Sequence, residues 1–234
     1  MNIIITGAGK GIGFEIAKLL SAAQGNKIIA VSRNIKNLQK LTNDIPVLKN
    51  SSLLYPLSLD LSKKGFETTL LSYVLDRFNK IDILINNAGI LINMDILQLT
   101  SDDFDQLFSV NVKAPFLIIR VLIPYFSRPS HIVNIGSMGG FQGSIKFPGL
   151  SLYSSSKGAL AIMTECFAEE LKDKGISVNC LALGSVSTEM LQKAFPGIKS
   201  DVTPADIAEF IVNFSLHVNK TINGKIIPVS LSSP

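Results

Sequence analysis

Short runs of apolar residues, rich in Ile and Val, alternate with longer segments of helical periodicity along the whole chain. The run "NIIIT" at 2–6 is followed by a helical pattern at 13–23 and then by "KIIAVS" at 27–32. A strand that is covered on both faces of a parallel sheet has a continuous apolar run and no polar alternation. The pattern therefore predicts an α/β protein, with a parallel sheet and helices on both faces.

The alternation continues to the C-terminal residues. Further strands are predicted at 53–59, 81–89, 131–137, 176–183 and 224–230, about seven in total. Further helices are predicted at 34–43, 63–78, 101–126, 152–173 and 204–216. Residues 1–234 contain no linker, low-complexity tract or internal repeat, so we expect a single doubly wound domain. In such a sheet, ligands bind at the carboxyl ends of the strands.

Composition excludes several classes of protein. Apolar residues make up 47% of the chain and charged residues 17%, which argues against disorder. The net charge of +4 comes without a run of Lys and Arg, so we expect no nucleic-acid partner. Cys166, Cys180, His131 and His217 lie in no ligand-like pattern, so no metal site is expected.

The chain begins "MNIIITGAG", directly in a predicted strand, which leaves no room for a signal or transit peptide. No uninterrupted apolar run reaches the roughly 18 residues that a membrane-spanning helix needs. We therefore expect a cytoplasmic protein that is not inserted in a membrane.

A glycine-rich segment, "TGAGKGIG" at 6–13, joins the first predicted strand to the first helix. Gly7, Gly11 and Gly13 allow a tight turn and a close approach of the backbone to a ligand. The N-terminus of the following helix offers free N–H groups to a pyrophosphate. At this position in an α/β sequence, the segment predicts a dinucleotide-binding turn.

The end of the second predicted strand indicates which dinucleotide is bound. A free ribose 2′-hydroxyl usually meets an acidic residue there, but this chain has Ser32 and Arg33, and the next acid is Asp44. A guanidinium group can bind a 2′-phosphate through two hydrogen bonds, and Lys10 can add a second positive charge. The sequence therefore predicts NADPH/NADP as the cofactor in preference to NAD.

Tyr153 and Lys157 lie one helical turn apart at the start of a predicted helix. Hydride transfer to a carbonyl carbon leaves an alkoxide, which must be protonated and stabilised. A free phenol has a pKa of about 10, and a nearby ammonium group lowers it. A serine hydroxyl, such as that of Ser137, can donate to the same oxygen. We expect Tyr153 to act as general acid and Lys157 to lower its pKa.

Four motifs occur in a characteristic order: TGxxxGIG at 6–13, "NNAG" at 86–89, Ser137, and YxxxK at 153–157. Together they resemble the short-chain dehydrogenases/reductases over nearly the whole chain. The resemblance implies a single Rossmann-type domain, a nicotinamide cofactor, a small-molecule carbonyl substrate and a homodimer or homotetramer.

The resemblance also implies roles for individual residues. The catalytic residues would be Asn111, Ser137, Tyr153 and Lys157, with Asn111 holding a water in a proton relay. Lys157 would also bind the nicotinamide ribose. The further cofactor-binding residues would be Gly7, Gly11, Ile12 and Gly13 at the pyrophosphate, Asp60 and Leu61 near the adenine, Asn87, Ala88 and Gly89 on the adenine side, and Gly184, Val186 and Thr188 near the nicotinamide amide.

The sequence departs from the family pattern in several places. Leu183 precedes Gly184 where the family usually has proline, and the segment 189–203, which often forms a helical lid, is short. The stretch 138–152 is longer than usual and would form one wall of the substrate site. The expected substrate-wall residues are mostly apolar: Ile90, Leu91, Met138, Phe141, Phe147, Met190 and Phe195.

These features predict an NADPH-dependent carbonyl reductase, most like the 3-oxoacyl-[acyl-carrier-protein] reductases. Reduction of a pteridine or another ketone is the alternative within the enzyme class. A second class stays open, a regulatory protein on the same fold that binds NADPH without turnover. The presence of Ser137, Tyr153 and Lys157 together favours an enzyme.

Overall fold

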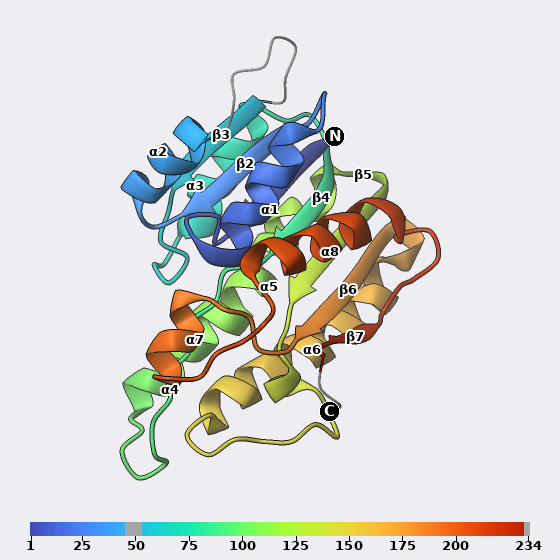
Figure 1. The fold of residues 1–234 in the computed structure, drawn as a ribbon. Helices are drawn as coiled ribbons and strands as arrows, with labels where there is room; N and C mark the ends of the chain where they lie inside the picture. Colours follow the sequence, from blue (N-terminus) through green and yellow to red (C-terminus); the bar gives the residue numbers. More distant parts are fainter. Residues whose placement is uncertain (45–52, 232–234) are drawn as a thin grey trace.

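The predicted strands form a single parallel sheet of seven strands in the computed structural model, which describes residues 1–44 and 53–231. The strands are β1 Asn2–Thr6, β2 Lys27–Ser32, β3 Leu53–Ser58, β4 Ile81–Asn86, β5 Phe126–Ile135, β6 Ile176–Leu183 and β7 Ile226–Val229. The α-helices are α1 Gly11–Ala22, α2 Ile35–Asp44, α3 Phe66–Leu75, α4 Ser101–Phe108, α5 Ala114–Leu122, α6 Ser151–Leu171, α7 Glu189–Ala194 and α8 Pro204–His217. Figure 1 shows the strands between two layers of helices.

The strand order is β3-β2-β1-β4-β5-β6-β7, and every neighbouring pair is parallel. The chain therefore builds outward from β1 in one direction and then crosses over to continue from β4 in the other. The carboxyl ends of β1 and β4 form the switch point at which such sheets bind ligands. The predicted single-domain, doubly wound fold is confirmed.

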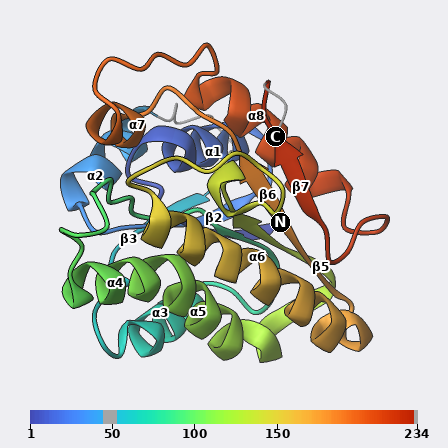
Figure 2. The ribbon, with the colours of Figure 1, turned by 90° about the horizontal axis from the view of Figure 1, so that it is seen from below.

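The two faces of the sheet are buried against different helices. Ile3 and Ile5 of β1 contribute to a core with α1, α2 and α8, while Ile4 contributes to a core with α3, α5 and α6. Successive side chains of a strand point to opposite faces, so a strand buried on both faces is apolar at every position. Figure 2 shows the two helical layers on either side of the strands.

The helix predicted over 101–126 is interrupted. A π-helical turn, Ser109–Lys113, separates α4 from α5, and a 3₁₀ turn, Ile123–Tyr125, leads directly into β5. Pro115 has no N–H, so it cannot donate the α-helical hydrogen bond to the carbonyl of Asn111. Single π-helical turns within helices are frequently found at functional sites.

Other elements also differ from the sequence predictions: β5 spans Phe126–Ile135 instead of 131–137, and α3 spans Phe66–Leu75 instead of 63–78. β4 ends at Asn86 and does not reach Gly89, because the backbone N–H groups of Asn87 and Ala88 turn toward the Thr6 hydroxyl. The segment after β6 contains a short helix, α7, that the sequence pattern did not predict. The predicted cap of α8 is confirmed, because Thr203 forms a capping box with Asp206.

The helical stretch Ser101–Tyr125 is long and apolar enough to cross a membrane by length and composition alone. Its mean hydropathy reaches that of a membrane-spanning helix, although polar residues interrupt its apolar runs. Its residues Leu107, Ile118, Ile119 and Leu122 are fully or almost fully buried within the domain. The stretch is a core helix of the fold.

Candidate active site

The glycine-rich turn lies between β1 and α1, at the switch point of the sheet. Gly7 and Gly11 have φ angles of +70° and +56°, which residues with a side chain rarely adopt. A Cβ atom on Gly13 would collide with the Gly7 carbonyl and the Asn87 amide. Lys10, the N-cap residue of α1, makes no side-chain capping bond, so the first N–H groups of the helix are available to an anion. The turn fits the pyrophosphate of a dinucleotide.

The "NNAG" segment is tied to this turn by four hydrogen bonds. The Thr6 hydroxyl accepts from the backbone N–H groups of Asn87, at 3.1 Å, and Ala88, at 3.0 Å. The Asn87 side-chain amide donates to the carbonyls of Thr6, at 3.0 Å, and Gly7, at 3.2 Å. Asn87 therefore holds the turn in shape, and the backbone that follows β4 lies against the turn.

Asn111 is fully buried, and its side chain fastens the segment after β4 to α6. Its amide oxygen accepts from the Ile90 N–H at 2.9 Å, and its amide nitrogen donates to the Ile90 carbonyl and the Ser156 hydroxyl, each at 3.0 Å. A Cβ atom on Gly89 would lie 3.3 Å from both the Asn111 amide oxygen and the Lys157 ammonium. The structure therefore brings Gly89, Asn111 and Lys157 together.

Ser137 and Tyr153 come from different elements. A close backbone contact between the turn after Ser137 and α6 brings them together. Ser137 follows β5 and precedes a 3₁₀ turn, Met138–Gly140, that packs on α6. A Cβ atom on Gly140 would lie only 2.5 Å from the backbone nitrogen of Gly158, so this approach requires glycine. The Ser137 hydroxyl accepts from the Gly139 N–H at 3.1 Å, and it lies close enough to the Tyr153 hydroxyl to influence the pKa of the phenol.

Tyr153 and Lys157 are both buried, with 9% and 5% of their surfaces exposed. Burial raises the pKa of Tyr153, and the hydrogen bond from Ser137 offsets part of this rise. Burial also lowers the pKa of Lys157 to about 8. The Lys157 ammonium donates to the Ile135 carbonyl at 2.8 Å.

The expectation that Lys157 brings the pKa of Tyr153 below its ordinary value is therefore wrong. Removal of the phenol from water outweighs the other influences, because desolvation penalises the charged phenolate. Tyr153 is consequently a protonated phenol at neutral pH. In this form it holds the proton that a general acid donates.

The candidate residues for the adenine side lie at the ends of β2 and β3. Gly9 packs so closely on Ser32 that a Cβ atom at this glycine would overlap the serine hydroxyl. Partial burial works to raise the pKa of Asp60, but hydrogen bonds from Ser62 and the charges of Arg33 and Lys63 hold it below its ordinary value. Leu61 is buried beside Asp60. Arg33 is exposed, and its charge lies near Asp60.

The segment after β6 approaches the glycine-rich turn from the other side. Leu183, which replaces the usual proline, extends β6 and pairs with β7, and the Gly184 N–H donates to the Val229 carbonyl at 2.9 Å. Val186 is buried in the core. Thr188 caps α7 by accepting from the Leu191 N–H at 3.2 Å, and its methyl carbon lies 3.6 Å from a Cβ position on Gly11.

The expected substrate-wall residues fall into three groups. Met138 and Phe141, in and after the 3₁₀ turn that follows Ser137, are half-buried. Ile90, Leu91 and Phe195 pack against the small cluster that contains Tyr153. Phe147 and Met190 have 57% and 37% of their surfaces exposed. The structure thus assembles part of an apolar wall beside Tyr153.

Sequence reasoning did not single out three residues that shape the site. Thr6 and Ser156 carry hydroxyl groups that hold Asn87 and Asn111, and Glu189 forms a 2.6 Å ion pair with Lys10. A hydroxyl residue directly before the first glycine was a readable signal for Thr6. Nothing in the sequence pairs Glu189 with Lys10, because 179 positions separate them.

Comparison with known proteins agrees with this geometry. The short chain dehydrogenase family pattern matches residues 1–199. A 3-oxoacyl-[acyl-carrier-protein] reductase of Thermotoga maritima is 32% identical over 192 residues, which are 81% of this chain and 76% of that protein.

Solved structures extend the comparison to almost the full length of the chain. A 3-ketoacyl-(acyl-carrier-protein) reductase from Brucella melitensis, complexed with NADH, is 26% identical and has a TM-score of 0.87, covering 98% of this chain and 96% of that one. A short chain dehydrogenase from Burkholderia cenocepacia, in complex with NADP, is 27% identical with a TM-score of 0.85, covering 97% and 95%. Members of this family bind nicotinamide cofactors and small-molecule substrates, and they typically form oligomers. With its glycine-rich turn, its Ser137–Tyr153 contact and these relatives, the chain belongs to the short-chain dehydrogenase/reductase family of oxidoreductases.

Proposed function

We propose that this protein is a cytoplasmic, NADPH-dependent carbonyl reductase that acts on a 3-oxoacyl thioester, with Tyr153 as its general acid. The observation that carries the proposal is the buried, protonated Tyr153, which lies beside the Ser137 hydroxyl and one helical turn from the buried Lys157. The apolar residues beside Tyr153 suit the acyl chain of such a substrate. The relative from Thermotoga maritima carries this activity in its name.

In the proposed mechanism, the bound nicotinamide supplies the hydride, and residues of the protein handle the developing negative charge. The Ser137 oxygen accepts from the Gly139 N–H, which holds the hydroxyl beside Tyr153, and its single O–H can turn from the Tyr153 oxygen to the substrate carbonyl oxygen. Tyr153 gives its phenolic proton to the same oxygen as charge builds up there. The high pKa of the buried phenol keeps that proton in place until substrate arrives.

Lys157 and Asn111 would help Tyr153 to regain its proton after the reduction. The Lys157 ammonium uses one of its three N–H groups on the Ile135 carbonyl, and the others can bind the ribose hydroxyl groups. Its positive charge stabilises the phenolate that proton donation leaves behind. Because the Asn111 side chain is engaged and Pro115 lacks an N–H, the Asn111 carbonyl is the group that we assign to the relay water.

The proposed preference for NADPH depends on residues of this chain. The two solved relatives are complexed with NADH in one case and NADP in the other. Here Arg33 follows β2 directly, and its guanidinium group is exposed where a ribose 2′-phosphate would lie. Its planar fork suits a phosphate better than a hydroxyl group.

The direct test is to follow NADPH consumption by the purified protein with a 3-oxoacyl thioester, a pteridine ketone and a simple aromatic ketone. We expect the thioester to give a kcat/KM at least about tenfold above the other two, since each buried methylene adds about 0.8 kcal/mol of binding. A higher kcat/KM for the pteridine ketone would make the chain a reductase of the alternative substrate class. Absence of turnover with all three would favour a binding protein.

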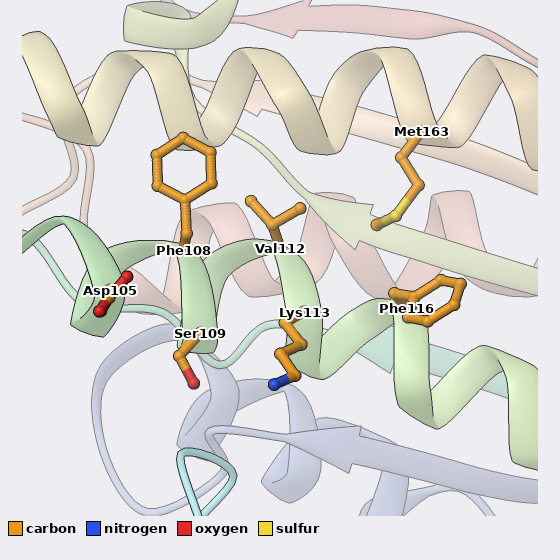
Figure 3. Close-up of a pocket in the computed structure, with 7 residues that line it drawn as sticks. All are labelled: Asp105, Phe108, Ser109, Val112, Lys113, Phe116 and Met163. Atoms are coloured by element: carbon orange, nitrogen blue, oxygen red, sulfur yellow. The ribbon is translucent and has the colours of Figure 1, made fainter.

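We also propose that the protein is a homodimer that pairs through a groove between α4–α5 and α6. The groove is lined by Asp105, Phe108, Ser109, Val112, Lys113, Phe116 and Met163. Figure 3 shows Met163 reaching from α6 toward Val112 and Phe116, with Lys113 between these two and pointing away from α6, and with Asp105 farther along, on α4. Asp105 and Lys113 are eight residues apart, about 12 Å along a helix. A two-fold axis that passes midway between Asp105 and Lys113 would bring each Asp105 against the Lys113 of the other copy, which gives a self-complementary interface.

A charge swap tests this pairing. Asp105→Lys or Lys113→Asp alone places like charges together and should shift the protein toward monomer by light scattering. The double variant restores opposite charges and should regain the dimer. Lys64→Asp, an exposed change before α3, is the control for net charge. An unchanged molar mass in both single variants would place the interface elsewhere.

A further inference from the structure

The short helix α7 is tied at its two ends to opposite sides of the site. At its start, the Glu189 carboxylate forms a 2.6 Å ion pair with Lys10 of the glycine-rich turn. At its end, the Ala194 carbonyl accepts from the Asn93 side chain at 2.6 Å, in the segment after β4. α7 therefore connects the turn that would bind the cofactor with the segment beside the substrate wall (Figure 1).

The ion pair lies where a dinucleotide must place its negative charge. The first turn of α1 contains no acidic residue and Lys10 makes no capping bond, so this helix start has no anion from its own sequence. Thr188, the residue before Glu189, lies against the Gly11 position. The Lys10 hydrogen bond and charge hold the pKa of Glu189 below its ordinary value, so its side chain is a carboxylate at neutral pH. Glu189 thus brings a negative charge to the positive end of α1.

Lys10 can exchange Glu189 for another partner. The side chains of Lys10 and Glu189 are 55% and 67% exposed, and exposed ion pairs contribute little to stability. A phosphate group offers Lys10 an acceptor of higher charge, while the same phosphate repels the Glu189 carboxylate. Binding of a phosphorylated cofactor and retention of the Lys10–Glu189 pair therefore oppose each other.

We propose that Glu189 is a specificity-determining residue that competes with the phosphate groups of the cofactor for Lys10, and that the same ion pair fastens the start of α7 in the cofactor-free protein. The proposal rests on the proposed function in one respect, the use of a nicotinamide dinucleotide. A carboxylate next to Lys10 penalises NADPH more than NADH, because NADPH carries the additional 2′-phosphate. Met190 follows Glu189 directly and Phe195 is the C-cap residue of α7, so the ion pair also bears on how α7 presents them to a substrate.

The first experiment measures the affinity of the Glu189→Gln variant for cofactors by fluorescence titration. We expect NADPH and the probe 2′,5′-ADP to bind about two- to fivefold more tightly than to the original protein, with a smaller change for NADH. High salt should shrink the difference, because it screens exposed charges. The matched control is Glu170→Gln, which removes an exposed carboxylate from the far end of α6 and should leave all three affinities unchanged.

The second experiment measures backbone hydrogen exchange of residues 189–203 in the cofactor-free protein. Glu189→Gln and Lys10→Met should each raise exchange there, and the double variant should add nothing further, because both remove the same contact. Exchange equal to that of the original protein would overturn the fastening of α7. A gain in NADPH affinity no larger than that of Glu170→Gln would overturn the competition.

The two experiments also separate this proposal from the proposed function. If the original protein binds neither NADPH nor NADH, both the proposed function and the competition for Lys10 are wrong. The exchange measurement still decides the fastening of α7 in that case, since it uses no cofactor. If the original protein binds NADPH and only the effect of Glu189→Gln is missing, the proposed function is unaffected and the role proposed for Glu189 is wrong.

Discussion

Tyr153→Phe is expected to lower kcat for carbonyl reduction by about a hundredfold to ten-thousandfold, the contribution of a positioned general acid. The variant loses only the phenolic proton donor, because phenylalanine keeps the ring that packs with Leu107 and Leu150. Affinity for NADPH should stay within about twofold, since Lys157 and the glycine-rich turn are unchanged. The loss therefore falls on kcat, as expected when an interaction of the transition state is removed.

The measurement combines single-turnover reduction with an NADPH titration and a thermal melt of the same sample. Tyr125→Phe is the matched control, because it removes a partly exposed phenol just before β5. If Tyr153→Phe reduces the substrate as fast as the original protein, Tyr153 is not the acid. If neither protein turns over any ketone while both bind NADPH, the chain is a cofactor-binding protein without catalytic activity.

Arg33→Ala is expected to weaken NADPH binding by about ten- to a hundredfold while it changes NADH affinity by less than about twofold. Hydrogen bonds to charged groups contribute about 1.5–3 kcal/mol each, and NADPH differs from NADH only in the 2′-phosphate. Arg33 is exposed at the end of β2, so its removal leaves no buried partner unpaired. The effect of Arg33 should exceed that of Lys10, which Glu189 already engages.

Titrations of both cofactors at two salt concentrations test this expectation. Arg120→Ala, an exposed arginine on α5, controls for the general loss of positive charge. Equal weakening of NADPH and NADH would assign Arg33 to the adenine or the ribose. No change in either affinity would mean that Arg33 does not contact the cofactor. The proposed preference for NADPH would then have no basis.

The strands and the glycine-rich turn could be predicted because their signals are local. A strand buried on both faces is apolar along its length, and the turn needs glycine where φ is positive or two backbones nearly touch. The break between α4 and α5 was not predicted, because the apolar pattern over 101–126 was interpreted as one helix. Pro115 removes one hydrogen bond to the Asn111 carbonyl, and the π-helical turn found there packs against α6, which is a contact between distant parts of the chain.

The sequence by itself determined the single parallel α/β domain, the position of the dinucleotide turn and the spacing of Tyr153 and Lys157, because each is set by residues within a few positions of one another. Only the tertiary structure decided the direction of the Tyr153 pKa, which follows from how completely the fold removes the phenol from water. It also decided that Lys10 meets Glu189, across 179 positions of the chain. Periodicity and motifs carry no information about which distant residues meet in space. Desolvation and charge pairing depend directly on those contacts.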